Sequence, residues 1–358
     1  MELQKKALII ELKFHQEIIP AQIFFLLGKG YEVHLFLAEH LYDRDLFNGL
    51  KDQIYLTLLP HTKGFINKVR LLFKVKLYIK QNKISRLILN TLDSNFNNFL
   101  LRIINDVQTI GIIHQLQKLK YKPLYYDNFK RVSGVLTLSQ YTLRYLTKNY
   151  NPGKPVSFFY PVFFPYNINP NGSNKLSGPE IINIAIPGQL DQTKRDYKTL
   201  IEILATNKED ASKFKFFLLG NAASANGPEI VSLIKSAKLE SLFSYTEGFV
   251  SYNHFFSCLS NADYVMPLLN KKIQQLPTYH ASQISASFNW AYAFNKPLIV
   301  HQFYINNVVS DYQSIGYSDY NLSCVLFNLV KPQKGETARS TPFFDFKAQQ
   351  ENYLKVFL

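Results

Sequence analysis

The sequence predicts an α/β protein of two domains, each built on a parallel β-sheet with helices between its strands. Its 358 residues are enough for two domains of ordinary size. Short apolar runs alternate with helix-like stretches, as they do in parallel sheets. This alternation stops at Pro161–Pro179, a stretch rich in Pro, Asn, Gly and Ser, and then begins again. The predicted organisation is therefore a first domain, a linker, a second domain and a C-terminal helix, over 1–165, 166–180, 181–340 and 341–358.

In the first half, six apolar runs are the predicted strands. They are Ala7–Leu12, Tyr31–Leu37, Ile54–Leu59, Leu87–Asn90, Thr109–Ile113 and Gly134–Leu138. Helix signals stand between them. Pro20 lies in the first turn of a helix predicted over Ile18–Gly28, and Ser139 caps one over Gln140–Lys148.

The second half repeats the pattern. The predicted strands are Ile181–Ile186, Phe214–Leu219, Leu242–Tyr245 and Asp263–Leu268, and helices are predicted to start at Tyr197, Ile230 and Tyr252. The stretch Gln283–Val300 predicts a polar loop, a helix capped by small hydroxyl residues, and a buried strand. Asn295 and Pro297 are expected to end that helix. Residues 344–358 form a last amphipathic stretch.

The formal charge of +14 is concentrated in the first half, because residues 1–170 carry +12 of it. This half is expected to meet an anionic partner, which could be a membrane surface, a nucleic acid or an acidic glycan. Lys63–Arg86 holds eight basic residues and no acidic one. A basic amphipathic helix there can lie on an anionic membrane or pack on the sheet as a crossover helix. Its apolar face is predicted to include Phe65, Val69, Leu72, Phe73 and Leu77.

Several classes of protein and site have no support in the sequence. No apolar run approaches the ~20 residues of a transmembrane helix, and the first residues do not resemble a signal peptide. Cys258 and Cys324 have no metal or redox spacing, so a cytoplasmic location is expected. Neither a phosphate-binding P-loop nor a dinucleotide GxGxxG is present. Metal-site and nucleic-acid-binding motifs are also absent, so no metal and no nucleic acid are predicted as ligands.

Four loops of the second half follow predicted strands and carry residues that suit a nucleotide diphosphate. Ligands of open parallel sheets bind at the carboxyl ends of the strands. Glycines let the backbone approach a ligand, basic side chains neutralise phosphates, and a helix start offers N–H donors. The candidates are Gly188, Gln189, Lys194, Arg195, Gly220, Asn221, Gly248, Tyr252, Ser285, Ala286, Ser287 and Asn289.

Candidate general bases lie in the first half. His15 and Glu17 follow the first predicted strand, and His114 follows the fifth. A histidine or carboxylate at such a strand end could deprotonate an acceptor hydroxyl. The alternative is a loop side chain with a local hydrogen bond. Asp93, after the fourth strand, is a further candidate.

Five segments together resemble glycosyltransferases of the GT-B fold, of the group that builds bacterial surface polysaccharides. They are VSGVLTLSQYTLRYL (132–146), IAIPGQLDQTKRDYKTLIEIL (184–204), FKFFLLGN (214–221), EGFVSYNHFFSCLSNADYVMPLL (247–269) and NWAYAFNKPLIV (289–300). The resemblance implies two Rossmann-like domains that face each other across a cleft. It also implies a sugar nucleotide bound mainly by the second domain, an acceptor bound by the first, and a C-terminal helix that crosses back to the first domain.

The resemblance implies transfer of a sugar from a UDP- or GDP-sugar to a glycan or lipid-linked glycan, without a metal. The basic first half would hold the enzyme at the anionic inner face of the membrane. His15 or Glu17 would be the base, and Lys194, Arg195 and Ser285–Ser287 would stabilise the leaving diphosphate. Retaining members commonly carry two glutamates seven residues apart, but this chain has Gln283 and Trp290 there. Retaining and inverting chemistry therefore both stay open.

Two other functions remain open as well. The first is an epimerase or phosphorylase built on the same two-domain fold. The second is a protein without catalytic activity that binds a glycan or a membrane. The missing glutamates are compatible with the second function.

Overall fold

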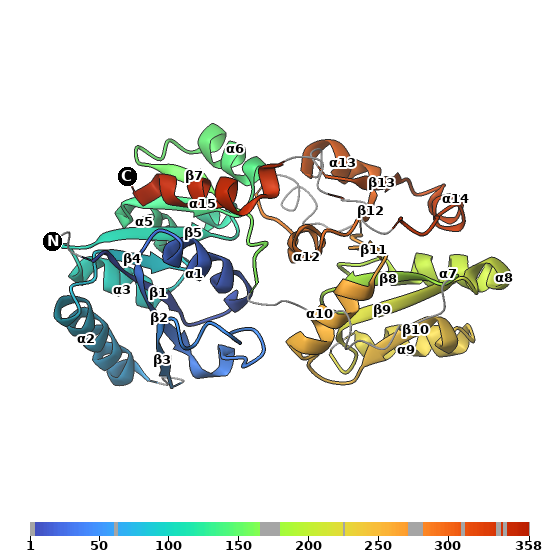
Figure 1. Cartoon of the computed structure of the whole chain (residues 1–358), viewed down its shortest axis with the longest axis horizontal. Coiled ribbons are helices and arrows are strands. Elements are labelled where there is room, and N and C mark those ends of the chain that lie inside the picture. The colour runs from blue at the N-terminus through green and yellow to red at the C-terminus, as the bar shows by residue number, and fades with distance from the viewer. Residues whose placement is uncertain are drawn as a thin grey trace. The chain divides into compact units, whose positions relative to one another are not determined.

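The computed structural model describes residues 4–60, 64–164, 180–224, 226–270, 282–308, 312–333, 338 and 342–357. The chain forms two compact units, each with its own parallel sheet (Figure 1). Unit 1 comprises Met1–Tyr166, Ala281–Ile284 and Phe343–Leu358, and unit 2 comprises Asn167–His280 and Ser285–Pro342. Of the linker predicted over 166–180, only Glu180 belongs to the described residues.

Unit 1 has a seven-stranded parallel sheet in the order β3-β2-β1-β4-β5-β6-β7. Its strands are β1 (Lys6–Glu11), β2 (Glu32–Ala38), β3 (Tyr55–Leu59), β4 (Arg86–Leu89), β5 (Gln108–Ile113), β6 (Gly134–Thr137) and β7 (Val156–Phe158). The six strands predicted in this half are confirmed. The edge strand β7 was not predicted, because three residues are too few to show an alternating pattern.

Helices cover both faces of this sheet. They are α1 (Ile19–Leu27), α2 (Phe65–Gln81), α3 (Asn95–Ile103), α4 (Lys118–Tyr121), α5 (Pro123–Arg131) and α6 (Gln140–Asn149). The β1–β2 connection runs in the opposite direction along the sheet from those that follow β3. Right-handed crossovers therefore put α1 on one face and α2, α3 and α5 on the other.

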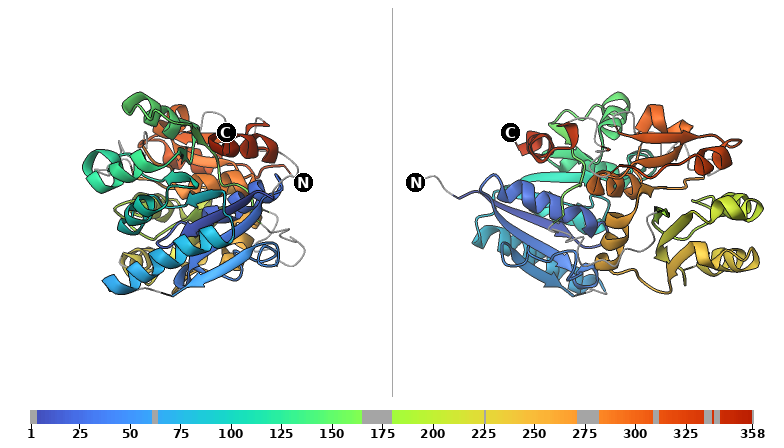
Figure 2. Two further views of the ribbon diagram at one scale, coloured as in Figure 1. Left: turned by 90° about the vertical axis from the view of Figure 1, so that its left-hand side faces the viewer. Right: turned by 45° about the vertical axis from the view of Figure 1, so that its right-hand side comes forward.

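Helix α2 is the outermost helix of its layer and lies next to α3 (Figure 2). Its packing face differs in part from the predicted one. Leu71, Leu72, Val75 and Ile79 are buried in the core of unit 1. Phe73 and Leu77 point outward instead, with exposed fractions of 62% and 55%. Among the described side chains of the predicted face only Leu72 belongs to this buried core, so the packing face is rotated around the helix axis from the predicted one.

The C-terminal segment belongs to unit 1, where α15 (Phe346–Leu354) packs beside α1 and β7. The side chain of Gln350 donates a hydrogen bond to the carbonyl of Phe25, and Gln349 accepts one from the backbone N–H of Tyr160. The ring of Tyr353 is fully buried against Phe25. The predicted C-terminal helix is therefore present and is anchored by polar and aromatic contacts.

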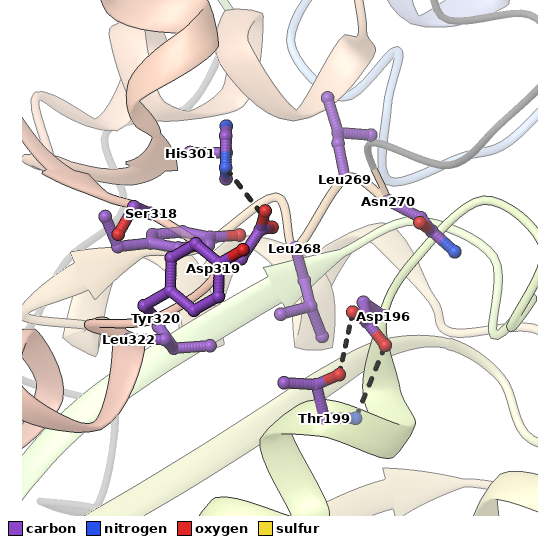
Figure 3. Close-up of a pocket in the computed structure, with 11 residues that line it drawn as sticks. Asp196, Thr199, Leu268, Leu269, Asn270, His301, Ser318, Asp319, Tyr320 and Leu322 are labelled. Carbon is purple, nitrogen blue, oxygen red and sulfur yellow. Dashed lines mark hydrogen bonds and ion pairs between the residues drawn. The ribbon is translucent and has the colours of Figure 1, made fainter.

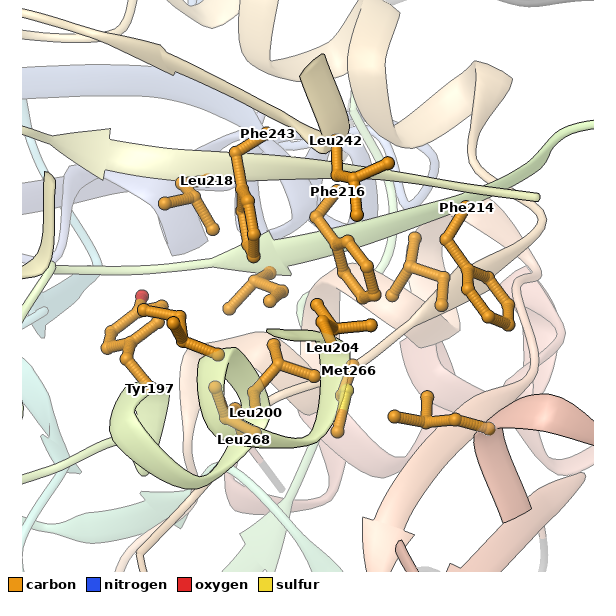
Figure 4. Close-up of a cluster of buried hydrophobic side chains, with 14 of the residues drawn as sticks. Tyr197, Leu200, Leu204, Phe214, Phe216, Leu218, Leu242, Phe243, Met266 and Leu268 are labelled. Atoms are coloured by element: carbon orange, nitrogen blue, oxygen red, sulfur yellow. The ribbon is translucent and has the colours of Figure 1, made fainter. Parts of the chain in front are cut away.

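Unit 2 has a six-stranded parallel sheet in the order β10-β9-β8-β11-β12-β13. Its strands are β8 (Ile182–Pro187), β9 (Phe214–Asn221), β10 (Phe243–Thr246), β11 (Tyr264–Val265), β12 (Leu298–His301) and β13 (Ser314–Tyr317). Its helices are α7 (Tyr197–Thr206), α8 (Lys208–Ala211), α9 (Gly227–Ser236), α10 (Tyr252–Asn261), α12 (Ala286–Phe294), α13 (Gln302–Val308) and α14 (Leu322–Phe327). Figure 4 shows how Leu200 and Leu204 of α7 pack on Phe214 and Phe216 of β9.

The predicted helix around Phe288 is confirmed as α12. The hydroxyl of Ser285 accepts a hydrogen bond from the backbone N–H of Ser287, and Asn295 ends the helix with a left-handed φ of 53°. Strand β11 is much shorter than predicted. Pro267 has no N–H to donate to a ladder, and Leu268 has a φ of +52°, so the strand stops before them.

Candidate functional site

The predicted nucleotide-binding loops of unit 2 lie at the carboxyl edge of its sheet. Gly188 follows β8, Gly220 and Asn221 end β9, and Gly248 follows β10. Because these strands are parallel neighbours, their carboxyl ends meet at one edge, where ligands of open α/β sheets bind. Helix α12 begins at the same edge, since it follows β11.

Two glycines allow close packing at the centre of this edge. A Cβ atom on Gly188, whose φ is +113°, would lie 2.0 Å from Nη2 of Arg195. A Cβ atom on Gly220 would lie 2.3 Å from the carbonyl oxygen of Gly188. Only glycine fits at either position, so the β8 and β9 ends and the guanidinium of Arg195 form one tightly packed group.

Arg195 is a buried cation without a carboxylate partner among the described residues. Its side chain is 8% exposed. The guanidinium donates to the carbonyl oxygens of Gln189 and Pro267 and, at 3.4 Å, to the hydroxyl of Ser287. A buried charge is costly unless an opposite charge compensates it, and a guanidinium has five N–H donors. The site therefore favours an anionic ligand.

The start of α12 adds donors next to Arg195. The hydroxyl of Ser287, 2% exposed, donates to the carbonyl of Pro187 at 2.9 Å, which ties α12 to the end of β8. Ala286 is the first residue of the helix, so its backbone N–H lies in the first turn. Asn289 is buried, and its Oδ1 atom has no hydrogen-bond partner within the described part of the chain. An unpaired amide oxygen at a ligand edge suits a hydroxyl or N–H donor.

The remaining predicted residues of unit 2 lie around this group. Oδ1 of Asn221 accepts the backbone N–H groups of Ala223 and Gly248, which holds the β9 and β10 ends together. Tyr252 begins α10, and its ring packs near Phe256. Lys194 is 44% exposed and pairs with Asp191 at 3.4 Å, so it contributes less to the buried group than Arg195 does.

A second polar group lies at the carboxyl edge of unit 1, around a residue that the sequence did not single out. Glu11 ends β1 and is 1% exposed. Its carboxylate accepts hydrogen bonds from the backbone N–H groups of Lys13 and Phe14 and from the side chains of Asn90 and Thr91. A carboxylate that directly ends an apolar run was the available signal. Burial raises the pKa of Glu11, against the opposing effect of these hydrogen bonds.

The three predicted catalytic residues of unit 1 are in contact. The rings of His15 and His114 stack with their centroids 3.7 Å apart, and Nδ1 of His15 lies 3.1 Å from Oε1 of Glu17. Because the carboxylate can only accept, Nδ1 carries the proton and Nε2 of neutral His15 has a free lone pair. Nε2 of His114 donates to the carbonyl of Asn90 at 2.7 Å. His114 therefore supports the ring of His15.

The two imidazoles have opposite pKa shifts. Burial lowers the pKa of His15. The hydrogen bond and charge of Glu17, together with the charges of Glu11 and Asp93, raise this pKa by more than burial lowers it, so the net shift is upward. Burial and the neighbouring charge of His15 hold the pKa of His114 well below its usual value. Of the two rings, His15 is therefore the one that takes up a proton at the higher pH.

The carboxylate of Asp93 forms ion pairs with two lysines. Lys118 contacts one of its carboxylate oxygens, and Lys13 lies 3.5 Å from the other. Its side chain is 10% exposed. Both carboxylate oxygens are thus engaged in ion pairs, so the geometry favours a structural role for Asp93.

Each unit has a pocket at its carboxyl edge. The pocket of unit 1, of about 730 Å³, is lined by apolar side chains such as Leu59, Leu72 and Phe99 together with Lys13 and Lys68. The pocket of unit 2, of about 350 Å³, is lined by Asp196, Leu269 and His301 among others (Figure 3), and Leu269 is the bridge partner of Arg195. Its polar groups are bonded to one another. Asp196 accepts from Thr199, and His301 pairs with Asp319 at 3.5 Å.

The described residues contain no group of three or more His, Cys, Asp or Glu side chains that could hold a metal ion. Among the helices of the described ranges, none is long and apolar enough to cross a membrane.

Solved structures with a similar fold include glycosyltransferases and sugar-nucleotide epimerases. Sucrose-phosphate synthase from Thermosynechococcus elongatus matches with a TM-score of 0.60 at 14% identity, over 99% of this chain and 93% of that one. UDP-GlcNAc 2-epimerase from Methanocaldococcus jannaschii matches with a TM-score of 0.64 at 14% identity, over 98% and 99%. Anabaena HepE in complex with UDP and glucose matches with a TM-score of 0.62 at 12% identity, over 97% and 94%. No family model and no curated protein matches the sequence.

The chain therefore has a GT-B-like fold of two Rossmann-like domains. The similarity at these identities concerns the fold alone.

Proposed function

We propose that this protein is a glycosyltransferase that moves a sugar from a nucleoside-diphosphate sugar to a hydroxyl of a glycan or lipid-linked glycan. The observation that carries the proposal is the buried guanidinium of Arg195 beside Gly188 and the start of α12. This arrangement of residues offers a fixed positive charge and N–H donors to a diphosphate, at the sheet edge where such folds bind ligands. UDP bound to proteins of the same fold, such as Anabaena HepE, is consistent with this ligand class.

In the proposed reaction, the acceptor oxygen forms a bond to the anomeric carbon of the donor. The bond between that carbon and the diphosphate breaks, and its electron pair leaves with the nucleoside diphosphate. The hydroxyl proton passes to Nε2 of His15, while Glu17 holds the proton on Nδ1 and stabilises the imidazolium. Arg195 and the first turn of α12 stabilise the charge that develops on the leaving diphosphate. No step of this scheme uses a metal.

The donor site is tested by thermal unfolding of the full chain with UDP, GDP, CMP and ADP and their sugar conjugates. A ligand of the folded state raises the melting temperature by mass action. We expect one diphosphate class to do so, and Arg195→Ala to abolish the shift. Lys194→Ala removes the same charge from the neighbouring residue, whose side chain is exposed. This variant should keep most of the shift in melting temperature. No shift with any nucleotide would contradict the proposal and favour a binding protein without catalysis.

An epimerase is a second candidate, because UDP-GlcNAc 2-epimerases have this fold. The two functions are separated by incubating the protein with the stabilising sugar nucleotide and no acceptor. Conversion to an isomeric sugar nucleotide would establish an epimerase. An unchanged donor that is consumed only when a glycan acceptor is added supports the transferase.

A further inference from the structure

Helix α2 of unit 1 has an apolar ridge on its solvent side. Ile66, Phe73 and Leu77 have exposed fractions of 67%, 62% and 55%. At 3.6 residues per turn, these three positions fall within about 40° of one another around the helix axis. The ridge is separate from the packing face, which consists of Leu71, Leu72, Val75 and Ile79. A helix that only covers a sheet needs one apolar face, and α2 has two.

Cations stand on both sides of this ridge. By the same helical geometry, Arg70 and Lys74 lie on one flank, and Lys76 and Lys80 lie on the other. All four side chains are exposed, and the sequence of α2 contains no acidic residue. None of the four has an ion pair within the described part of the chain. This surface therefore attracts anions and apolar groups at the same time.

The pocket of unit 1 also combines apolar and cationic groups, and it lies on the packing side of α2, where Leu71 and Leu72 line it. Lys68 of α2 lines it as well, and across it lies Phe99 of α3, 51% exposed. The space of about 730 Å³ is mainly apolar with lysines among its lining residues. Both the helix and the pocket present apolar and cationic groups. An amphiphile with an apolar chain and an anionic head is complementary to both kinds of group.

We propose that the outward face of α2 docks on an anionic lipid bilayer. The ridge enters the boundary between head groups and acyl chains, and the flanking cations contact lipid phosphates. A protein partner fits less well, because three side chains are a small patch compared with a stable protein interface. The proposal does not rest on the transferase reaction, since it concerns only the charge and exposure of one helix.

The test is sedimentation of the full chain with vesicles, without any nucleotide. One set contains phosphatidylcholine alone and the other contains added phosphatidylglycerol. We expect binding to the anionic set at low salt, weakening steeply as salt rises. Lys74→Gln with Lys80→Gln should weaken binding roughly 30-fold, at about fivefold for each cation near the surface. Phe73→Ser with Leu77→Ser should also reduce it, because the ridge is lost.

Matched variants in unit 2 separate the face of α2 from general charge and hydrophobicity. Lys208→Gln with Lys235→Gln removes the same charge from exposed positions, and Tyr320→Ser with Val330→Ser removes exposed apolar groups. Both should bind vesicles like the parent protein. Unchanged melting temperatures would show that every variant is folded.

Three results would overturn the proposal: no binding to anionic vesicles at low salt, equal binding by the α2 variants and the parent, or equal binding to phosphatidylcholine alone. A parent protein that self-associates in solution, with monomeric α2 variants, would assign the face to a second copy of the chain instead. Nucleotide binding can succeed or fail independently of all these results.

Discussion

His15 is the residue at which the proposed chemistry is most sharply defined. Its ring is stacked on His114 and hydrogen-bonded to Glu17, and its backbone has an unusual φ of +73°. A non-glycine residue keeps such a conformation only where its surroundings hold it. Its side chain is 31% exposed, so the ring is partly open to an acceptor. The position of His15, the proton on its Nδ1 atom and its partial exposure therefore all favour Nε2 as the proton acceptor.

The rate of transfer should fall on the acid side because His15 must be neutral to accept a proton. Its folded-state pKa is raised, so the fall should begin above the usual imidazole pKa. Glu17→Gln removes the largest upward contribution and should move the acid limb to lower pH. His15→Ala should lower kcat about 10²- to 10⁴-fold, the usual contribution of a general base. Initial rates measured against pH check this, and an acid limb unmoved in Glu17→Gln would argue against the assignment.

Gly188 is the second residue at which a single atom matters. Gly188→Ala should destabilise unit 2 and weaken nucleotide binding, because the new Cβ would displace the Arg195 guanidinium. Backbone strain at this φ adds about 1–3 kcal/mol to the cost. Gly248→Ala is the matched control for stability, since its φ of +104° is similar but no atom lies within 4 Å of its Cβ position. Equal losses of stability in the two variants would show that the contact with Arg195 is unimportant.

At the scale of elements, the long buried strands were predictable, whereas the short edge strand β7 and the capped helix α3 were not. The apolar runs of β1 and β8 are buried on both faces, and this is why they stand out in the sequence. Helix α3 was missed, because its Asn-rich start, Asn95 to Asn98, is typical of turns. Ser94 compensates by accepting a hydrogen bond from Asn97. Such capping can be recognised in a structure more readily than in a sequence.

The candidate site was predictable where residues follow strands and was missed where tertiary contacts decide. His15, Gly188 and Arg195 were found from their positions after strands. The role of Glu11 depends on Asn90 and Thr91, which are far from it in sequence. That Arg195 has no carboxylate partner among the described residues also depends on how distant segments pack. Neither property can be predicted from the spacing of residues along the chain.

The cap of α6 gives a prediction at the same scale. The hydroxyl of Ser139 accepts from the backbone N–H of Thr142 at 3.2 Å and is fully buried. Ser139→Ala should lower the free energy of unfolding by about 1 kcal/mol, up to ~2, because a buried N–H loses its partner. Thr147→Ala on the exposed side of the same helix should change it very little. Urea unfolding of the two variants measures the difference, and equal effects would contradict the capping role.

At the scale of the whole molecule, the chain order and the spatial grouping differ. The last segment of the sequence belongs to unit 1, although most of unit 2 lies between this segment and the rest of unit 1 in the sequence. The sequence could predict the existence of this segment from its amphipathic pattern. Its destination depends on matching groups such as Gln22 and Phe25 on α1, which receive the hydroxyl and the ring of Tyr353.

The stability of unit 1 should therefore depend on Tyr353 more than that of unit 2 does. Its fully buried ring also packs 5.1 Å from Phe159, so Tyr353→Ala should cost about 3–5 kcal/mol. Tyr353→Phe loses only the hydrogen bond to Gln22 and should cost about 0.5–1.5 kcal/mol. Trp290, the one tryptophan of the sequence, lies in α12 and reports on unit 2. For Tyr353→Ala we expect the circular dichroism transition to broaden toward lower temperature while the tryptophan fluorescence transition stays in place. If both transitions move together, the two units unfold as one, and the stabilising effect of α15 extends to the whole chain.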